Sequence, residues 1–366
     1  MADWTRRFDA AYRFMRVSRA TGYETERLSG FERGGTIERN LDTEAKESGI
    51  VGHVGALDLG ADLVRVWLDA TFPDGSTESV ALGTFLASTT SRAYDGMAST
   101  VTVKLAGRLS ELSATQFAQP FYLPAGTNLV AYAAQIAQSC GLSVDADPSD
   151  YVSTEALYYG IQSGEQKAST QSQTKLAVIN DLLDRAGFDS ARTDPYGTVL
   201  MRRSQGVADR APSWGFAEGR NARFLRSATD ERDTTGVANV VYAVHAGAEK
   251  EGGEQVTTIG VATDDDPASP WSTASLGREI VARYDYSEYA TQTAADAKAA
   301  ELLASARSVL RRVTLSHVYA PVTIGDAVRV DYRSAGTTET LAARTQRITL
   351  GDGCLTETEA RAYERA

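Results

Sequence analysis

Three consecutive carboxylates stand beside two prolines in the segment Thr263–Trp271, which reads TDDDPASPW. Carboxylate oxygens bind Ca²⁺ when a loop presents them at alternate positions, followed by a flexible glycine and a distant bidentate glutamate. Here Ala268 interrupts the pattern, and Pro267 and Pro270 stiffen the loop. Because Asp bonds its own backbone and Pro fixes φ, the segment predicts a sharp solvated turn, with weak cation capture as the alternative.

Other segments fail the templates of catalytic and phosphate-binding sites. Gly55 and Gly60 have the spacing of a phosphate loop, but Ala61 and Asp62 stand where Lys and Ser or Thr belong, and an aspartate would repel phosphate. No GxSxG or GxGxxG motif is present. The histidines lie too far apart for an HExxH zinc site, and each is in or beside an expected strand: His53, His245 and His317. We therefore expect no catalytic residues, no cofactor-binding residues, no metal ligands and no cofactor.

The two cysteines, Cys140 and Cys354, are far apart and have no CxxC partner. This spacing indicates neither a disulfide framework nor a zinc site. We expect both to be buried thiols.

The overall charge bears on possible partners. The 366 residues include 48 acidic and 37 basic side chains, for a net charge of −11. Gripping nucleic acid requires concentrated Lys and Arg, so this balance argues against such a function. Residues 1–17 lack the apolar run of a signal peptide, and Leu129–Cys140 is too short to span a bilayer. We expect a chain made in the cytoplasm without stable membrane insertion.

Residues 1–116 are predicted to be rich in β-structure. The segments 13–17, 62–68 and 100–105 cluster or alternate β-branched and aromatic residues, and 72–76 supplies turn chemistry. Several short strands separated by turns favour a barrel or a sandwich.

Residues 117–212 predict a small α/β module with two helix-glycine-strand units. In the first unit, Thr127 or Asn128 can cap a helix that Gly141 ends, before a strand at 142–145. In the second unit, Thr174 caps and Gly187 ends the helix. Helical spacing relates the apolar residues of each stripe: Leu129, Tyr132, Ala133, Ile136 and Cys140 in the first, and Leu176, Ile179, Leu182, Leu183 and Ala186 in the second. Asp194–Gly197 then turns a hairpin into a strand at 198–201.

The β pattern resumes in residues 213–366, beginning with a strand at 237–244. An alanine-rich surface helix is expected from Thr293 to about Leu310, with Leu302, Leu303 and Val309 facing inward. Three strands are then expected to close the chain, at 312–319, 327–332 and 340–350. The fold class is thus mainly β with an α/β insert, in three domains of residues 1–116, 117–212 and 213–366.

Several segments, in order along the chain, resemble the hub proteins of tailed bacteriophages, which include contractile-tail baseplate hubs and the structural N-terminal region of siphophage tail-associated lysins. The similar segments are 34–41 (GGTIERNL), 46–49, 57–67, 81–86, 123–128 (LPAGTN), 237–241, 264–270 with Gly277–Arg278, and 291–297. The resemblance implies two tail-tube-like β-barrels joined by α/β material, and a homotrimeric ring that matches a sixfold tail tube above and a threefold tip below.

The resemblance also implies the neighbours of such a ring. These are a distal tail protein or tail tube above, a tape measure protein, and tip spike or fibre proteins below, with DNA passing through the channel without specific binding. The expected location is the virion tail. The family's lysins carry a C-terminal hydrolase or fibre, whereas this sequence ends at Ala366 soon after its last expected strand, so we expect no enzymatic activity.

Three hypotheses for function follow. The first is a structural tail hub, of a phage or a phage-derived particle, in which an acidic lumen lets DNA slide by like-charge repulsion. The second is a receptor- or carbohydrate-binding tail-tip module, whose aromatic platform would use Trp214 and Trp271. The third, a peptidoglycan hydrolase, has the least support because no catalytic motif is present.

Overall fold

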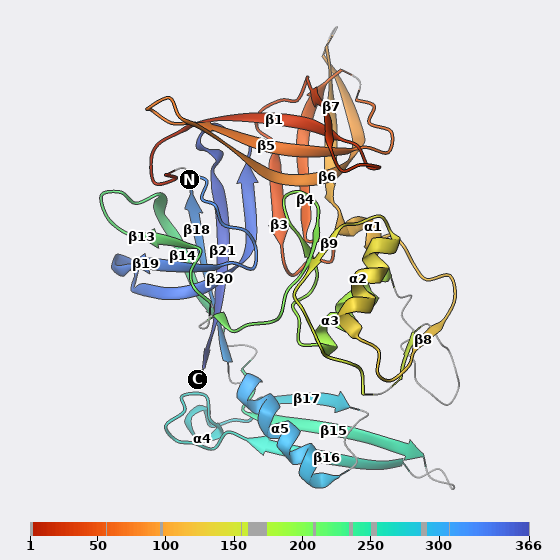
Figure 1. The fold of residues 1–366 in the computed structure, drawn as a ribbon. Coiled ribbons are helices and arrows are strands. Elements are labelled where there is room, and N and C mark those ends of the chain that lie inside the picture. Colours follow the sequence, from red (N-terminus) through yellow and green to blue (C-terminus); the bar gives the residue numbers. More distant parts are fainter. Residues whose placement is uncertain are drawn as a thin grey trace. The chain divides into compact units, whose positions relative to one another are not determined.

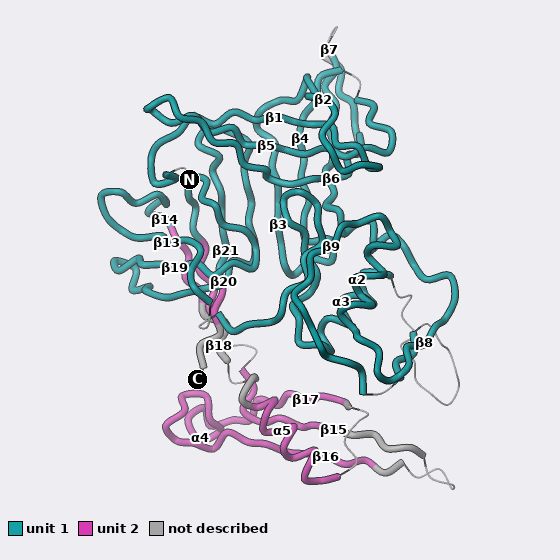
Figure 2. The backbone as a smooth tube through the Cα atoms, in the orientation of Figure 1, with its two compact units in different colours: residues 1–227, 315–360 teal, residues 228–314, 361–366 magenta. Residues whose placement is uncertain are grey.

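The computed structural model divides the chain into two compact units, residues 1–227 with 315–360 and residues 228–314 with 361–366 (Figure 2). It describes residues 3–55, 57–95, 98–154, 156–159, 174–207, 210–233, 237–249, 255–286, 291–306 and 308–365. The strands β14, β18 and β21 begin in one unit and end in the other.

The N-terminal strands form one half of a large sheet, the main sheet. They are β1 (Asp9–Val17), β2 (Glu24–Leu28), β3 (Thr36–Asn40), β4 (Glu47–Val54), β5 (Leu63–Thr71), β6 (Thr77–Asp95) and β7 (Ala98–Gly107). Their order is β3-β4-β7-β6-β5-β1-β2, and neighbouring strands are antiparallel, as between β1 and β5, where Phe14 faces Val66. Alternation along β4 buries every second residue, as expected for a sheet with one covered face.

The C-terminal strands continue the same sheet. They are β13 (Trp214–Ala217), β14 (Phe224–Asp233), β18 (Ser308–His317), β19 (Ala327–Tyr332), β20 (Thr337–Thr349) and β21 (Thr356–Arg365). The seam between the two halves is the antiparallel pair β3–β20, in which Ile37 faces Ile348. From this seam the order runs β20-β21-β18-β14, and β19 pairs with both β20 and β13.

The mainly β class with an α/β insert is confirmed, with differences in detail. The described strand pairs form an open path from β14 to β2 rather than closed rings, so the barrel part of the expectation is not confirmed. A fourth strand, β21, follows the three that were expected to close the chain. Its alternation of small polar and charged residues, TETEARAYER, lacks the β-branched run that marks a strand in sequence.

Both ends of the chain supply the apolar core of the main sheet. The core combines residues between 4 and 105 with residues between 319 and 354. Trp4 packs edge-on against Phe8, Phe72 and Tyr319, with ring centroids 4.9–5.6 Å apart. The N-terminal segment is therefore fixed by contacts with residues more than 300 positions away.

The segment that we propose as the α/β module, residues 117–212, carries the two helices predicted there (Figure 1). Short α1 (Leu109–Ser113) precedes it, and α2 (Leu129–Ser139) and α3 (Lys175–Arg185) pack against each other within it. Asn128 caps α2 by accepting from the Ala131 amide at 2.9 Å, and Thr174 caps α3 by accepting from the Ala177 amide at 3.1 Å. Gly141 and Gly187 follow the helices with φ of +78° and +73°, which explains the glycine at each stop.

Short strands accompany these helices. They are β8 (Phe121–Leu123) paired with β10 (Leu157–Tyr159), and β9 (Val144–Ala146) parallel to β12 (Val199–Met201), which also pairs with β11 (Arg192–Thr193). Asp194 closes the β11–β12 hairpin by accepting from the amides of Tyr196 and Thr198. The stripe residues Leu129, Ile136, Leu176, Ile179 and Leu182 are all buried in one apolar cluster, as the spacing predicts.

The second unit contains a three-stranded sheet covered by a helix. The sheet order is β16 (Gln255–Thr263), β15 (Val240–Glu249), β17 (Val281–Tyr286). In the chain, α4 (Thr273–Leu276) lies between β16 and β17, and α5 (Gln292–Ala306), which follows β17, covers the sheet (Figure 1). A Cβ on Gly260 would stand 2.0 Å from the Ala295 carbonyl oxygen, so glycine allows α5 to approach the sheet closely. None of the described helices has the length and apolar character needed to cross a membrane.

The alanine-rich helix is shorter than predicted. Leu303 is buried and Leu302 is half-buried, but the helix ends at Ala306, and Val309 lies in strand β18. The alternation in Ser308–Leu315, SVLRRVTL, favours a strand, and this signal outweighs the helical spacing at that point.

Candidate functional site

The acidic segment at 264–266 is a turn built around one buried carboxylate. Asp264 is 2% exposed; its Oδ2 accepts from the Ser269 hydroxyl at 2.7 Å and its Oδ1 from the Asp266 amide at 3.3 Å. Asn239, also buried, accepts from the Ile280 amide and donates to the carbonyls of Trp271 and Arg278. The turn is confirmed, but its first aspartate is an internal anchor rather than a solvated side chain.

The histidines are dispersed, as predicted from their positions. His53, in β4, is buried, lies edge-on to Phe31, and donates from Nε2 to the Ser29 carbonyl at 3.0 Å. His245 lies in β15, where its backbone pairs with Thr258. His317, in β18, is fully buried against Phe216. Within the described ranges, no group of three or more His, Cys, Asp or Glu side chains could hold a metal ion.

The remaining candidates from the sequence also occupy structural positions. The loop after Gly55 leads into strand β5 rather than a helix, and residue 56 lies outside the described residues. Cys354 is buried, which raises the pKa of its thiol to about 11, whereas Cys140 is half-buried and accepts from Lys175 Nζ at 3.2 Å. Both thiols are free, although only Cys354 is fully buried as expected. Trp214 and Trp271 are half-buried.

A chain of buried polar side chains connects the two halves of the main sheet with the α/β module. Its members are Thr193, Glu47, Arg39, Gln346, Thr358 and His317, all at most 6% exposed. They come from β11, β4, β3, β20, β21 and β18. We call this set the buried polar chain, and it is the first of two joints between the module and the strands of the main sheet.

Arg39 stands at the centre of the buried polar chain. It donates to Gln346 Oε1 at 3.1 Å and to the Leu82 carbonyl at 2.5 Å, and its Nε lies 3.7 Å from Glu47 Oε1. Thr193 donates to the other Glu47 oxygen at 2.9 Å, so the module contributes one end of the chain. Burial raises the pKa of Glu47 to about 7, while Arg39 and the Thr193 hydroxyl act in the opposite direction.

His317 ends the buried polar chain on the other side. Its Nδ1 lies 2.7 Å from the Val318 carbonyl, which can only accept, so Nδ1 carries the proton and Nε2 accepts from the Thr358 hydroxyl at 2.8 Å. Burial lowers the pKa of His317 to about 4, which keeps the ring neutral. The imidazole is therefore a satisfied structural group rather than a base exposed to substrate.

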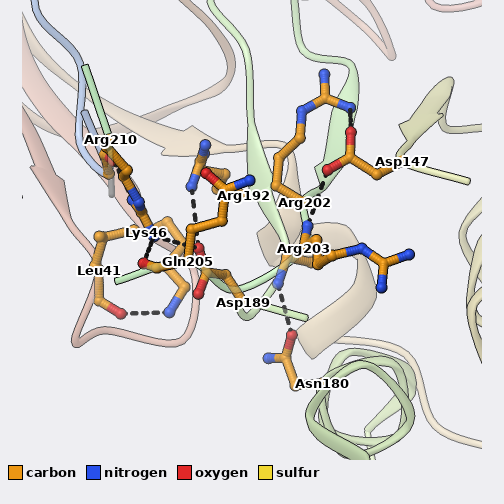
Figure 3. Close-up of polar contacts among 12 residues, drawn as sticks. Leu41, Lys46, Asp147, Asn180, Asp189, Arg192, Arg202, Arg203, Gln205 and Arg210 are labelled. Atoms are coloured by element: carbon orange, nitrogen blue, oxygen red, sulfur yellow. Dashed lines mark hydrogen bonds and ion pairs between the residues drawn. The ribbon is translucent and has the colours of Figure 1, made fainter. Parts of the chain in front are cut away.

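A second joint, rich in arginine, fixes the module to the C-terminal strands (Figure 3). Arg210 donates to the carbonyls of Gly325 at 2.8 Å and Gln205 at 2.6 Å, and its Nη2 lies 3.5 Å from Asp189. Arg192, beside the same carboxylate at 4.0 Å, is buried enough that desolvation lowers its pKa. Neither joint can be seen in the sequence, because the contacts that link separate elements join residues far apart, such as Arg210 with Gly325 and Arg39 with Gln346.

Within the module, Asp147 organises the segment that leads to this joint. It accepts from Arg202 Nη1 at 3.2 Å and from the Arg203 amide at 2.9 Å, and Asn180 accepts from the Ala191 amide at 3.0 Å (Figure 3). Each contact ties a loop to a neighbouring element. The chemistry of both joints is positional: their hydrogen bonds and ion pairs hold parts of the chain together.

Comparison with known proteins identifies the fold. No protein-family model matches the chain, and no curated protein matches it. Among solved structures, a tail protein from Neisseria meningitidis is similar at 15% identity, with a TM-score of 0.64 over 97% of each chain. The 43 kDa tail protein of prophage MuSo2 from Shewanella oneidensis is similar at 12% identity and a TM-score of 0.61, over 96% of this chain and 98% of that one.

A third structure agrees with these two. The prophage tail protein gp18 from Listeria monocytogenes is similar at 12% identity and a TM-score of 0.55, over 95% of this chain and 94% of that one. In all three comparisons the structural similarity covers nearly the full length of this chain and of the compared chain. The chain therefore has the fold of bacteriophage and prophage tail proteins.

Proposed function

We propose that the protein is the structural hub of a phage or phage-derived tail, forming a homotrimeric ring that joins the sixfold tail tube to the threefold tip and encloses the DNA channel. The observation that carries this proposal is the agreement in fold with tail proteins over 97% of both chains. The proposed location is the virion tail. The proposed neighbours are a distal tail protein or tube, a tape measure protein and a tip spike or fibre.

Symmetry and sheet edges support a closed assembly. A sixfold tube can be capped by three copies that each offer two similar surfaces, and strands β1–β7 and β13–β21 supply two β-rich regions in one chain. The path of the main sheet ends at β2 and β14. Unpaired strand edges invite pairing with other chains, and a closed ring covers them.

The charge of the chain supports passage of DNA rather than binding. At a net charge of −11 per copy, a ring presents a repulsive wall to phosphates, so DNA slides without being held. His53 and His317 are buried and the two joints hold elements of the chain together, which supports structural rather than catalytic roles for these polar groups. We propose that the protein is not an enzyme.

Light scattering coupled to gel filtration and electron microscopy of the purified protein test the hub. We expect a threefold ring with an axial channel wide enough for duplex DNA and a wall richer in Asp and Glu than in Lys and Arg. A sixfold ring of this chain, a persistent monomer at micromolar concentration, or a basic wall would contradict the proposal.

A receptor- or carbohydrate-binding role is the second candidate, and one observation favours it. Tyr122 and Tyr158 face each other across β8–β10, stack with centroids 6.1 Å apart, and are 62% and 48% exposed. Such aromatic faces suit stacking against sugars. Loss of binding to host cell walls in Tyr122→Ala, with Tyr196→Ala as an exposed control, would support it; equal binding would count against it.

A further inference from the structure

A cavity of about 520 Å³ lies within the first unit, where segments distant in sequence meet. Its lining comes from the start of β1, from Arg33, from Arg223 before β14, from Val318 after β18, and from the turn at Asp352–Gly353. Backbone contacts hold these segments: the Val318 amide donates to the Arg223 carbonyl at 3.2 Å, and the Tyr319 amide donates to the Gly353 carbonyl at 3.3 Å. The volume is in the range of small-ligand sites.

The charge of the lining differs from that of the whole chain. The lining residues include three arginines, Arg7, Arg33 and Arg223, and two aspartates, Asp9 and Asp352. The lining therefore carries one net positive charge, although the chain carries −11. A cationic cavity on an acidic protein favours an anion at this place.

Arg223 has unused hydrogen-bonding capacity. Its Nη2 donates to the Arg6 carbonyl at 2.7 Å, but its buried Nε has no partner in the part of the chain that the structure describes. Burial lowers the pKa of this guanidinium, and the nearby Asp3 carboxylate only partly opposes that effect. A buried N–H without an acceptor is costly, so an acceptor oxygen from a ligand would be stabilising.

The two other arginines are available at the rim. Arg7 is exposed and makes no side-chain hydrogen bond or ion pair within the described ranges. Arg33 lies 3.4 Å from Asp352, but the two side chains are 69% and 97% exposed. An ion pair so exposed contributes little stabilising free energy, so Arg33 can leave Asp352 for a ligand with little loss of stability.

We propose that this cavity binds an oxyanion, a phosphate or carboxylate group, through Arg223 with Arg7 and Arg33. The guanidinium fork matches the oxygen geometry of both groups, and charge-assisted hydrogen bonds of this kind are the strong ones. Phe8 and Val318 add apolar lining, which suits a ligand whose charged group is joined to an apolar body. The site goes beyond the hub function and does not depend on the ring.

Isothermal titration calorimetry with inorganic phosphate and with citrate, at an ionic strength held constant with chloride, tests the site. We expect saturable binding to the parent protein and a loss of about tenfold in affinity in Arg223→Gln. Arg7→Gln, which changes an exposed rim residue, is expected to lose about threefold. The control is Arg283→Gln, which removes the same charge from an exposed pair with Asp285 in the second unit and should bind as the parent does.

The two probes distinguish the source of the oxyanion: binding of phosphate alone assigns a phosphate group, and binding of citrate alone assigns a carboxylate. If Arg223→Gln does not fold, Arg7→Gln still decides the matter. The absence of saturable binding by either probe, or equal affinities in Arg7→Gln and Arg283→Gln, would overturn the proposal.

Discussion

The α/β module and the main sheet differ in where their cores come from. The module's apolar cluster is drawn from residues 109–201, a continuous stretch of chain. The main sheet's cluster joins residues 4–105 with residues 319–354. Local patterns therefore determine the first core, whereas the second exists only when the two ends of the chain meet.

The two regions also differ in what their interiors contain. The module's cluster consists of apolar side chains around α2 and α3. The main sheet encloses the Arg39–Glu47 pair and its polar partners. An apolar core loses stability gradually as atoms are removed, but a buried charge left without its partner is strongly unfavourable.

The largest effect is expected from Arg39→Ala. The variant leaves Glu47 buried beside no cation and removes the donor to Gln346, so the free energy of unfolding should fall by about 3–5 kcal/mol. Urea denaturation followed by tryptophan fluorescence measures the loss.

A double variant separates the charge from the packing. Arg39→Met combined with Glu47→Leu removes both charges and keeps apolar volume, so it should recover much of the lost stability. If the double variant is as unstable as Arg39→Ala, then packing around these side chains, and not the unpaired charge, accounts for the effect.

Leu182→Ala should be the most damaging change in the module. Leu182 is fully buried in α3, and truncating such a leucine costs about 2–5 kcal/mol. Because the module's core is local, we expect faster amide hydrogen exchange in α2 and α3 while β5 and β6 keep their protection. Equal loss of protection in all four elements would show that the two cores unfold as one.

The module was the part of the fold most accessible from sequence. The caps at Asn128 and Thr174, the stops at Gly141 and Gly187, and the two apolar stripes are short-range features with direct physical causes. For the same reason the module's boundaries at 117–212 could be proposed. The sequence alone leaves Thr127 and Asn128 equally possible as the cap, because either side chain can accept a hydrogen bond at that position.

The main sheet was predictable in class but not in connectivity. Strand patterns marked most of its elements, yet nothing near Ile37 in the sequence indicates that it pairs with Ile348. The joints were equally hidden, since Arg39 and Glu47 resemble ordinary surface charges until the partners Gln346 and Thr193 are placed beside them. No site residue was predicted, and the cavity lined by Arg223 lies where segments meet that no local pattern relates.

The pH dependence of stability should reveal the buried carboxyl of the main sheet. Because burial raises the pKa of Glu47 from 4.5 to about 7, its contribution is full below about 4.5 and is lost as the pH rises through about 7. Relative to Glu47→Gln, the parent should therefore lose on the order of 1–3 kcal/mol between pH 4.5 and pH 7.5.

His317 has the opposite dependence. Burial lowers its pKa from 6.5 to about 4, so its contribution is present above 6.5 and is lost as the pH falls through about 4. Since His317 is common to the parent and Glu47→Gln, its effect cancels in the difference between them. A difference that stays constant over this pH range would show that Glu47 does not change protonation there.

The smallest effect concerns the helix cap that the sequence left undecided. Asn128 Oδ1 accepts from the Ala131 amide, whereas the Thr127 hydroxyl donates to the Pro124 carbonyl outside the helix. Removing a capping side chain costs about 1 kcal/mol, so Asn128→Ala should lower the free energy of unfolding by that amount.

Asn128 also donates to the Ser149 carbonyl, so Asn128→Asp, which keeps the capping oxygen and removes that donor, shows how much of the loss belongs to the cap. Thr127→Ala is the matched control on the neighbouring residue and should lose less, because no amide of α2 depends on it. Chemical denaturation of the three variants, with hydrogen exchange at Ala131, measures the difference. A larger loss in Thr127→Ala than in Asn128→Ala would show that Asn128 is not the capping residue. It would also weaken the claim that local contacts alone define the module.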